Sequence, residues 1–170
     1  MPRELGIALF ILLGVALLLL MVFSWRRRTR RQAGLGRPVA APEDVGASIG
    51  VFPGLYLATT LAGRRLERVA IRPLGFRAEG SVLVAERGLV VNLVGSDAFS
   101  IPKADIDGAR RASWTIDRGV EEDGLNMIAW TLTAPDGRRT ELESYFRLRE
   151  PQAFDSAIAQ IAPKTEGTPV

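Results

Sequence analysis

The first part of the chain is almost continuously apolar. No charged residue occurs from Leu5 to Trp25, and only Gly6, Gly14 and Ser24 interrupt the apolar run. At about 1.5 Å per residue, a helix of this length matches the roughly 30 Å hydrocarbon core of a bilayer. A buried helix of a soluble protein would normally have a polar face, which this run lacks. The pattern therefore predicts a transmembrane helix over residues 1–25.

Basic residues flank this apolar run unevenly. Arg3 is balanced by Glu4, whereas no acidic residue follows the run before Glu43. Because positively charged flanks stay in the cytoplasm, we expect the N-terminus outside and the rest of the chain inside. A cleaved signal peptide is the competing interpretation, but it has its charge before the apolar run and a cleavage site after it. The residues expected to orient the helix are Arg26, Arg27, Arg28, Arg30 and Arg31.

The next segment, residues 26–47, has no helical or strand period. Its interrupting residues are Gly34, Gly36, Pro38, Pro42 and Gly46. This composition predicts a flexible, arginine-rich tether whose ends lie about 25 Å apart. The arginines could also suggest nucleic-acid binding, yet the adjacent bilayer makes anionic lipid the nearer partner. We therefore expect them mainly to set the orientation of the helix.

Short runs of β-branched, leucine and aromatic residues dominate the chain beyond the tether, and turn residues separate them. They predict a mainly β domain over residues 48–163, either a barrel or a sandwich. The predicted strands are Leu55–Thr60, Leu66–Ile71, Ser81–Glu86, Leu89–Leu93, Ala98–Ile101, Ala109–Ile116, Met127–Ala134 and Thr140–Phe146.

Turn and helix signals complete this domain. Arg87-Gly88 and Pro135-Asp136-Gly137 predict tight hairpins, since glycine adopts the positive φ that such turns need. From Pro151 to Pro163 the apolar residues recur every three or four positions, which predicts one amphipathic helix that closes an open end of the barrel. The tail, residues 164–170, is predicted to be disordered.

Several short segments resemble a known family. They are Gly54-Leu55-Tyr56 with Thr59-Thr60, then Leu66-Glu67-Arg68-Val69, Gly75-Phe76-Arg77, the hairpin Glu86-Arg87-Gly88-Leu89-Val90-Val91, and Phe99-Ser100-Ile101-Pro102 with Ile106. With the preceding apolar and arginine-rich segments, this order resembles actinobacterial single-pass membrane proteins that have a pleckstrin-homology-like (PH-like) domain. The resemblance implies a bent, partly open β barrel capped by the C-terminal helix, and it provides no catalytic signature.

Composition excludes much enzyme chemistry. The chain contains neither cysteine nor histidine, so it has no disulfide, no thiolate metal site and no imidazole base. After Arg37 the acidic residues outnumber the basic ones, which argues against nucleic acid as a partner. We therefore expect a protein that is not an enzyme and holds no metal or cofactor.

Two patterns that could suggest chemistry have simpler explanations. Ser100-Ile101-Pro102-Lys103 matches a Ser-x-x-Lys motif, but the proline disfavours the helical turn that this motif requires. The acidic runs Asp105-Ile106-Asp107-Gly108 and Glu121-Glu122-Asp123-Gly124 lack the ligand spacing of a calcium loop. We interpret both runs as solvated turns.

Five arginines lie within fourteen residues in the first part of the predicted domain. They are Arg64, Arg65, Arg68, Arg72 and Arg77, with Glu67 among them. In an extended strand Arg68 and Arg72 would point to the same side, and so could form a basic strip that binds lipid or an acidic partner. An ordinary solvated strand face with neighbouring acidic residues is the alternative interpretation.

These observations predict a binding module held in the cell membrane. We expect a membrane-associated protein as its partner, bound along a strand edge or in a groove of the domain. Recognition of anionic lipid through the arginine strip is the first alternative. A role in transport or export is the second, in which Gly6 and Gly14 offer a small-residue face to other spans.

Overall fold

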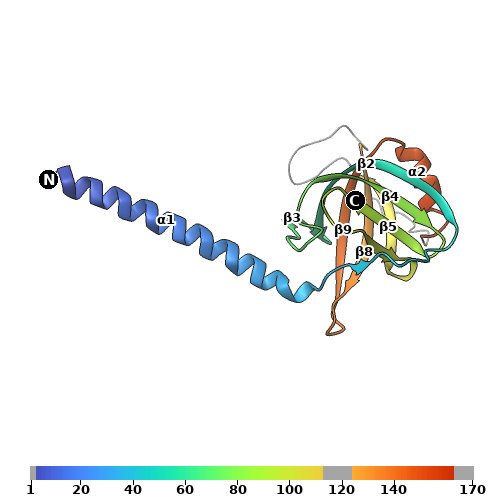
Figure 1. The fold of residues 1–170 in the computed structure, drawn as a ribbon, viewed down its shortest axis with the longest axis horizontal. Coiled ribbons are helices and arrows are strands. Elements are labelled where there is room, and N and C mark those ends of the chain that lie inside the picture. The colour runs from blue at the N-terminus through green and yellow to red at the C-terminus, as the bar shows by residue number, and fades with distance from the viewer. Residues whose placement is uncertain (1–2, 113–123, 163–170) are drawn as a thin grey trace. The chain divides into compact units, whose positions relative to one another are not determined.

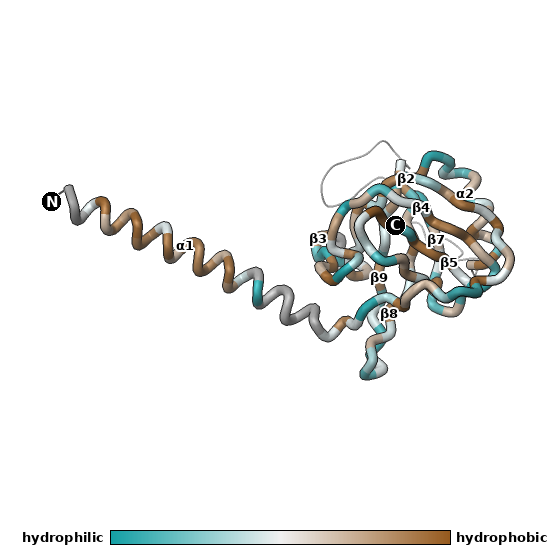
Figure 2. The backbone as a smooth tube through the Cα atoms, in the orientation of Figure 1, coloured by the Kyte–Doolittle hydropathy of each residue, from teal (hydrophilic) through white to brown (hydrophobic). Residues whose placement is uncertain are grey.

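The computed structural model describes residues 3–112 and 124–162, and its chain divides into residues 1–34 and residues 35–170. The first unit is a single helix, α1 (Arg3–Gln32), shown in Figure 1. Its segment Gly6–Ser24 is long and apolar enough to cross a membrane, a character that signal sequences share. Figure 2 shows the hydrophobic stretch along α1.

The second unit is a mainly β domain with a C-terminal helix (Figure 1). Its described strands form one antiparallel sheet in the order β1-β6-β5-β4-β2-β9-β8-β7, with β3 paired to β2 alone. The elements are η1 (Ala33–Leu35), β1 (Val39–Ala40), β2 (Ser48–Leu61), β3 (Arg64–Arg68), β4 (Ala78–Ala85), β5 (Gly88–Leu93), β6 (Phe99–Pro102), η2 (Lys103–Asp105), β7 (Ile106–Ala112), β8 (Leu125–Thr133), β9 (Arg139–Leu148) and α2 (Pro151–Ile158).

The long strand β2 connects the two halves of the sheet. Its first part pairs with β4 and its second part with β9, and an irregularity between Tyr56 and Ala58 marks the bend. Gly54 lies where the two pairings overlap. A Cβ atom there would clash with the carbonyl oxygen of Arg147 and would lie 2.8 Å from the Cα of Leu148. Glycine is therefore needed at this crossing, and the strand can bend the sheet into a partly open barrel.

The helix α2 covers one end of this barrel. Pro151 starts it, as predicted, because a missing N–H group costs nothing in the first turn. Phe154, Ala157 and Ile158 are buried on its inner face. The ring of Phe154 meets that of Phe52 from β2 edge to face, with centroids 5.3 Å apart. α2 therefore closes the core, as the hydrophobic spacing predicted.

The observed strands differ from the predicted ones in their bounds, most of all β2, which begins at Ser48 and not at Leu55. Two other predictions need an explanation. Leu66–Ile71 was expected to be a strand, but β3 ends at Arg68 and a turn follows. The prediction was wrong because Val69 is buried from a loop, so its apolar character does not report a strand. For the predicted strand Ala109–Ile116 the described part, β7, ends at Ala112. Residues 113–116 of that prediction, the acidic residues 121–123 and the tail 164–170 lie outside the described residues.

The tether predicted for residues 26–47 also needs correction. α1 continues to Gln32, since no glycine or proline occurs before Gly34 and arginine favours a helix. Leu35 already packs against the core of the domain. Val39 and Ala40 pair with Ser100 and Phe99 as strand β1. Pairing with distant residues therefore orders much of a segment whose local sequence resembles a linker.

Candidate binding cleft

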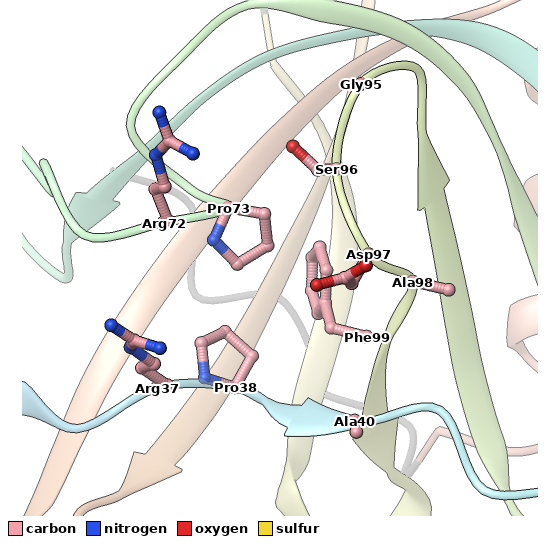
Figure 3. A pocket seen from close by; sticks show the side chains of 10 residues that line it. All are labelled: Arg37, Pro38, Ala40, Arg72, Pro73, Gly95, Ser96, Asp97, Ala98 and Phe99. Carbon is pink, nitrogen blue, oxygen red and sulfur yellow. The ribbon is translucent and has the colours of Figure 1, made fainter.

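An open cleft of about 710 Å3 lies between three segments of the domain that are far apart in sequence. Its size falls in the range of ligand sites in proteins, about 300–1,000 Å3. Figure 3 shows Arg37 and Arg72 on one side, each next to a proline, with Ser96 and Asp97 across from them. The lining residues are Arg37, Pro38, Ala40, Arg72, Pro73, Gly95, Ser96, Asp97, Ala98 and Phe99.

The segment before β2 forms the first wall of the cleft. We call residues 35–47 the arm. Its strand β1 pairs antiparallel with β6, and the Ala41 N–H donates to the carbonyl of Ala98 at 3.3 Å. Proline at position 38 fixes its own φ and favours an extended backbone at Arg37. The arm thus places an arginine beside the loop between β5 and β6.

A turn between β3 and β4 forms the second wall. Leu74 is completely buried in the core, whereas Arg72, two residues earlier, is exposed. The hydroxyl of Tyr56 donates to the carbonyl oxygen of Leu74 at 2.8 Å. The Val69 N–H donates to the carbonyl of Thr59 at 2.8 Å and fixes the start of the same segment. Burial of one leucine therefore holds an exposed arginine at the cleft.

The hydrogen bond to Leu74 is the end of a buried chain of four bonds. The indole N–H of Trp130 donates to Ser144 Oγ at 2.9 Å, and the hydroxyls of Ser144 and Thr59 lie 2.6 Å apart. The hydroxyls of Thr59 and Tyr56 lie 2.7 Å apart. An indole only donates and a carbonyl only accepts. Each hydroxyl therefore accepts one bond and donates the next, and the direction runs from Trp130 to Leu74.

The loop between β5 and β6 forms the third wall. The Ser96 N–H donates to the carbonyl of Leu93 at 3.1 Å, and Gly95 supplies the positive φ of this turn. Phe99 is buried behind the loop and starts β6. Ser96 and Asp97 are exposed and line the cleft. A hydroxyl and a carboxylate thus face two guanidinium groups across an open space (Figure 3).

Charge distribution decides which ligands suit the cleft. Among the described residues, neither Arg37 nor Arg72 forms an ion pair within 4.0 Å, although five other arginines do. Guanidinium groups bind carboxylates and phosphates through paired N–H donors. Asp97 is acidic and accepts hydrogen bonds from N–H or ammonium groups. The cleft therefore suits a ligand that offers an anionic group and, a short distance away, hydrogen-bond donors.

The predicted arginine strip is not a single strand face. Arg72 lies in a turn and not in an extended strand, so the premise that it shares a side with Arg68 was wrong. Arg68 Nη2 donates to the carbonyl of Leu57 at 2.9 Å, and Arg64 pairs with Glu67 at 3.3 Å. Arg65 belongs to β3, and Arg77 is exposed just before β4. Among the arginines of this group whose side chains the structure describes, Arg72 is the one that lines the cleft.

Arg37, Ser96 and Asp97 were not predicted as site residues. The sequence holds one usable signal, because Arg37-Pro38 and Arg72-Pro73 are the two Arg-Pro dipeptides of the chain and both line the cleft. The five arginines expected to orient the membrane helix, Arg26, Arg27, Arg28, Arg30 and Arg31, lie on the continuation of α1. Their role remains a prediction from charge asymmetry.

The remaining candidate chemistry has structural explanations within the described residues. Ser100 lies on β6 and Lys103 begins the 3-10 helix η2. The Ser-x-x-Lys segment is therefore a strand followed by a short 3-10 turn. The prediction of a solvated turn from Asp105 to Gly108 was wrong in part, because Asp107 lies on β7 and accepts a hydrogen bond from the Thr131 hydroxyl at 2.9 Å. In residues 3–112 and 124–162, no group of three or more acidic side chains is placed to hold a metal ion.

A comparison with known families assigns the second unit. A family described as bacterial PH domain-like matches residues 35–162, nearly the whole of the second unit. The chain belongs to this family. No curated protein sequence matches the chain. In this bacterial PH domain-like protein the match begins at Leu35, which agrees with the packing of the arm against the domain. PH-like domains are typically binding modules.

Proposed function

We propose that this chain is a membrane-anchored, non-enzymatic adaptor that presents its PH-like domain at the cytoplasmic face to a membrane-associated protein. One observation carries the proposal: two arginines without an ion pair among the described residues share an open cleft with a serine and an aspartate. An acidic peptide segment satisfies both sides. Its carboxylate binds the arginines, and its main-chain N–H groups donate to Asp97.

A peptide fits this cleft better than a phosphate alone. Asp97 would repel a phosphate that lay close to it, but it accepts the N–H groups that every peptide bond supplies. The ends of the described strand order, β1 and β7, add main-chain groups that an extended partner could pair with. Recognition of an anionic lipid headgroup is the second candidate, because Arg37 follows the apolar segment Gly6–Ser24 closely in sequence.

The anchor in this proposal is the segment Gly6–Ser24. Uneven flanking charge supports an N-terminus outside and the domain inside. Ten residues, 25–34, separate this segment from the family domain, and as a helix they reach only about 15 Å. The domain therefore works close to the bilayer, where a membrane-associated partner is concentrated.

The orientation is testable because the native chain has no cysteine. Thr133, exposed at the end of β8, is changed to cysteine in the full-length protein. We expect a membrane-impermeant maleimide to leave intact cells unlabelled and to label the same membranes after permeabilisation. Labelling of intact cells would place the domain outside. Recovery of a shortened chain in the soluble fraction would instead support signal-peptide cleavage.

The cleft is tested by crosslinking in native membranes. A photoreactive amino acid replaces Ala98 in the full-length chain, and the second variant also carries Arg37→Gln and Arg72→Gln. We expect a defined protein adduct that falls about a hundredfold when both arginines are lost, since each charge-assisted hydrogen-bonded contact contributes about 1.4 kcal/mol or more, or about tenfold in affinity.

A matched pair elsewhere on the domain controls for net charge. Arg147→Gln and Arg149→Gln remove two exposed arginines that do not line the cleft, and the adduct should persist. If both double substitutions reduced the protein adduct equally, partner binding would depend on net charge and not on the cleft. Adducts to lipid, with none to protein, would favour the lipid headgroup. An adduct that ignores Arg37 and Arg72 would contradict the proposed site.

A further inference from the structure

The cleft has one wall that is only weakly attached to the domain. Arg37, Pro38 and Ala40 belong to the arm, whereas every other lining residue belongs to the domain from Arg72 onward. Strand β1 pairs over just two residues. The hydrogen bonds beside it are long: 3.3 Å from Ala41 N to the Ala98 carbonyl and 3.4 Å from Ser100 Oγ to the Ala40 carbonyl. These two bonds therefore add little to the stability of the docked state.

The far end of the arm is attached more firmly. The Asp44 carboxylate accepts from the Gly46 N–H at 2.9 Å and pairs with Arg87 at 2.7 Å. These contacts, the hydrogen bond first, hold the pKa of Asp44 below its usual range. The N–H groups of Glu86 and Arg87 donate to the carbonyls of Ala47 and Val45. The arm is thus fixed at the hairpin between β4 and β5.

The segment from Leu35 to Ala41 is held mainly by packing and has no ion pair or side-chain cap like that of Asp44 among the described residues. Gly36 lies against Ala134 and Pro135. Leu35 packs only partly against the core, Val39 is 56% exposed, and Pro38 has no N–H group to donate. If residues 35–43 leave the domain while Asp44 stays in place, the free chain lengthens by up to roughly 30 Å. Docking of this short segment therefore decides how far the domain can move from the end of α1.

The two arginines connect this docking to the ligand. When the arm docks, Arg37 joins Arg72 on the same cleft, and two positive charges approach one another. A carboxylate between them replaces this repulsion with two attractive contacts. Such a ligand binds the docked arm better than the released arm. By linkage, it must then shift the arm toward the docked state.

We propose that an acidic segment of the partner bridges Arg37 and Arg72 and thereby locks the arm onto β6, shortening the reach of the domain. This inference rests on the proposed function, because it assigns the same cleft a carboxylate-bearing peptide. It adds that the arm is a displaceable part of the site. Partner binding and domain reach are therefore coupled.

Hydrogen exchange measures this coupling on the native sequence. The full-length protein is placed in phosphatidylcholine nanodiscs, and N-acetyl-tetraglutamate peptide serves as the probe. We expect saturating probe to slow exchange at the Ala41 N–H about fivefold or more, while β5 stays unchanged. The Arg72→Gln variant should lose this protection. The same measurement in nanodiscs with phosphatidylglycerol and no peptide tests the lipid headgroup.

A disulfide provides the second measurement. Val39 and Ser100 are directly paired across β1 and β6, a Cα separation that a disulfide can span, so Val39→Cys with Ser100→Cys introduces one cysteine pair into a chain without other cysteines. The oxidised form keeps the arm docked, and the reduced form of the same protein is its control. We expect the oxidised form to bind the peptide about two to ten times more tightly, the reciprocal of a docked fraction of about 0.5 to 0.1.

The outcomes separate the two proposals. Probe binding with equal affinity in both redox forms and no arm protection would overturn the coupling and leave the cleft as a site. Binding to neither form, and no arm protection of the native chain, would overturn both. Arm protection by phosphatidylglycerol without peptide would overturn the peptide ligand. If the cysteine variant fails to fold, exchange on the native chain decides alone.

Discussion

Replacing Leu74 with alanine is expected to lower the free energy of unfolding of the domain by about 2–5 kcal/mol. Leu74 is completely buried, and it belongs to the apolar core together with Val69 and Tyr56. Alanine leaves a cavity that the surrounding strands fill only partly. The measurement is guanidinium denaturation of the full-length protein in detergent, followed by near-ultraviolet circular dichroism.

The Leu74→Ala substitution should also weaken ligand binding in the cleft. Leu74 holds the turn that carries Arg72, so a loosened turn should weaken binding of the acidic probe at temperatures where the domain is still folded. Leu66→Ala is the matched control, because Leu66 lies in the same excursion between β2 and β4 but is 78% exposed. It should change stability by no more than about 0.5 kcal/mol. Equal effects of the two substitutions would show that Leu74 is not an anchor.

These residues also show what sequence patterns could and could not predict. The first helix was predicted from the length of its apolar run, the last helix from apolar residues three or four positions apart, and most strands from short apolar runs between turn residues. Val69 and Leu74 are as buried as strand residues, yet they belong to a loop and a turn. Hydropathy reports burial and not backbone conformation. The same pattern therefore predicted a strand through Ile71 where the chain turns.

The candidate site was harder to predict for a different reason. Its walls come from the arm, a turn and the loop between β5 and β6, which the sheet brings together from distant parts of the sequence. Five closely spaced arginines were visible in the sequence. The prediction that they share one strand face required an extended backbone, but β3 stops at Arg68. Arg37 was assigned to the tether because no local pattern records that its neighbours pair with β6.

A second large effect is expected from Tyr56→Phe, which removes one hydroxyl from the middle of the buried chain. The ring still fills the core, but the Leu74 carbonyl loses its donor and the Thr59 hydroxyl loses its acceptor. An unpaired buried polar group costs about 1–3 kcal/mol. We therefore expect Tyr56→Phe to lower the free energy of unfolding by about 1–3 kcal/mol at pH 8, measured by the same denaturation experiment.

The pH dependence of that loss identifies its cause. Burial raises the pKa of Tyr56 above its usual value of 10.0. The folded state therefore keeps the proton at a pH where the unfolded chain releases it. The stabilisation is complete below about pH 10 and falls as the pH rises further, by roughly 1 kcal/mol at pH 11.

Phenylalanine has no proton to release, so the variant lacks this contribution. The difference in unfolding free energy between the native protein and Tyr56→Phe should therefore shrink by roughly 1 kcal/mol from pH 8 to pH 11. Tyr145 and the other titrating groups are present in both proteins, and their effects cancel in the difference. A constant difference across this range would mean that the Tyr56 hydroxyl exchanges its proton with solvent as freely in the folded protein as in the unfolded one. The directed chain from Trp130 to Leu74 would then not exist, and some other contact would have to hold the turn at the cleft.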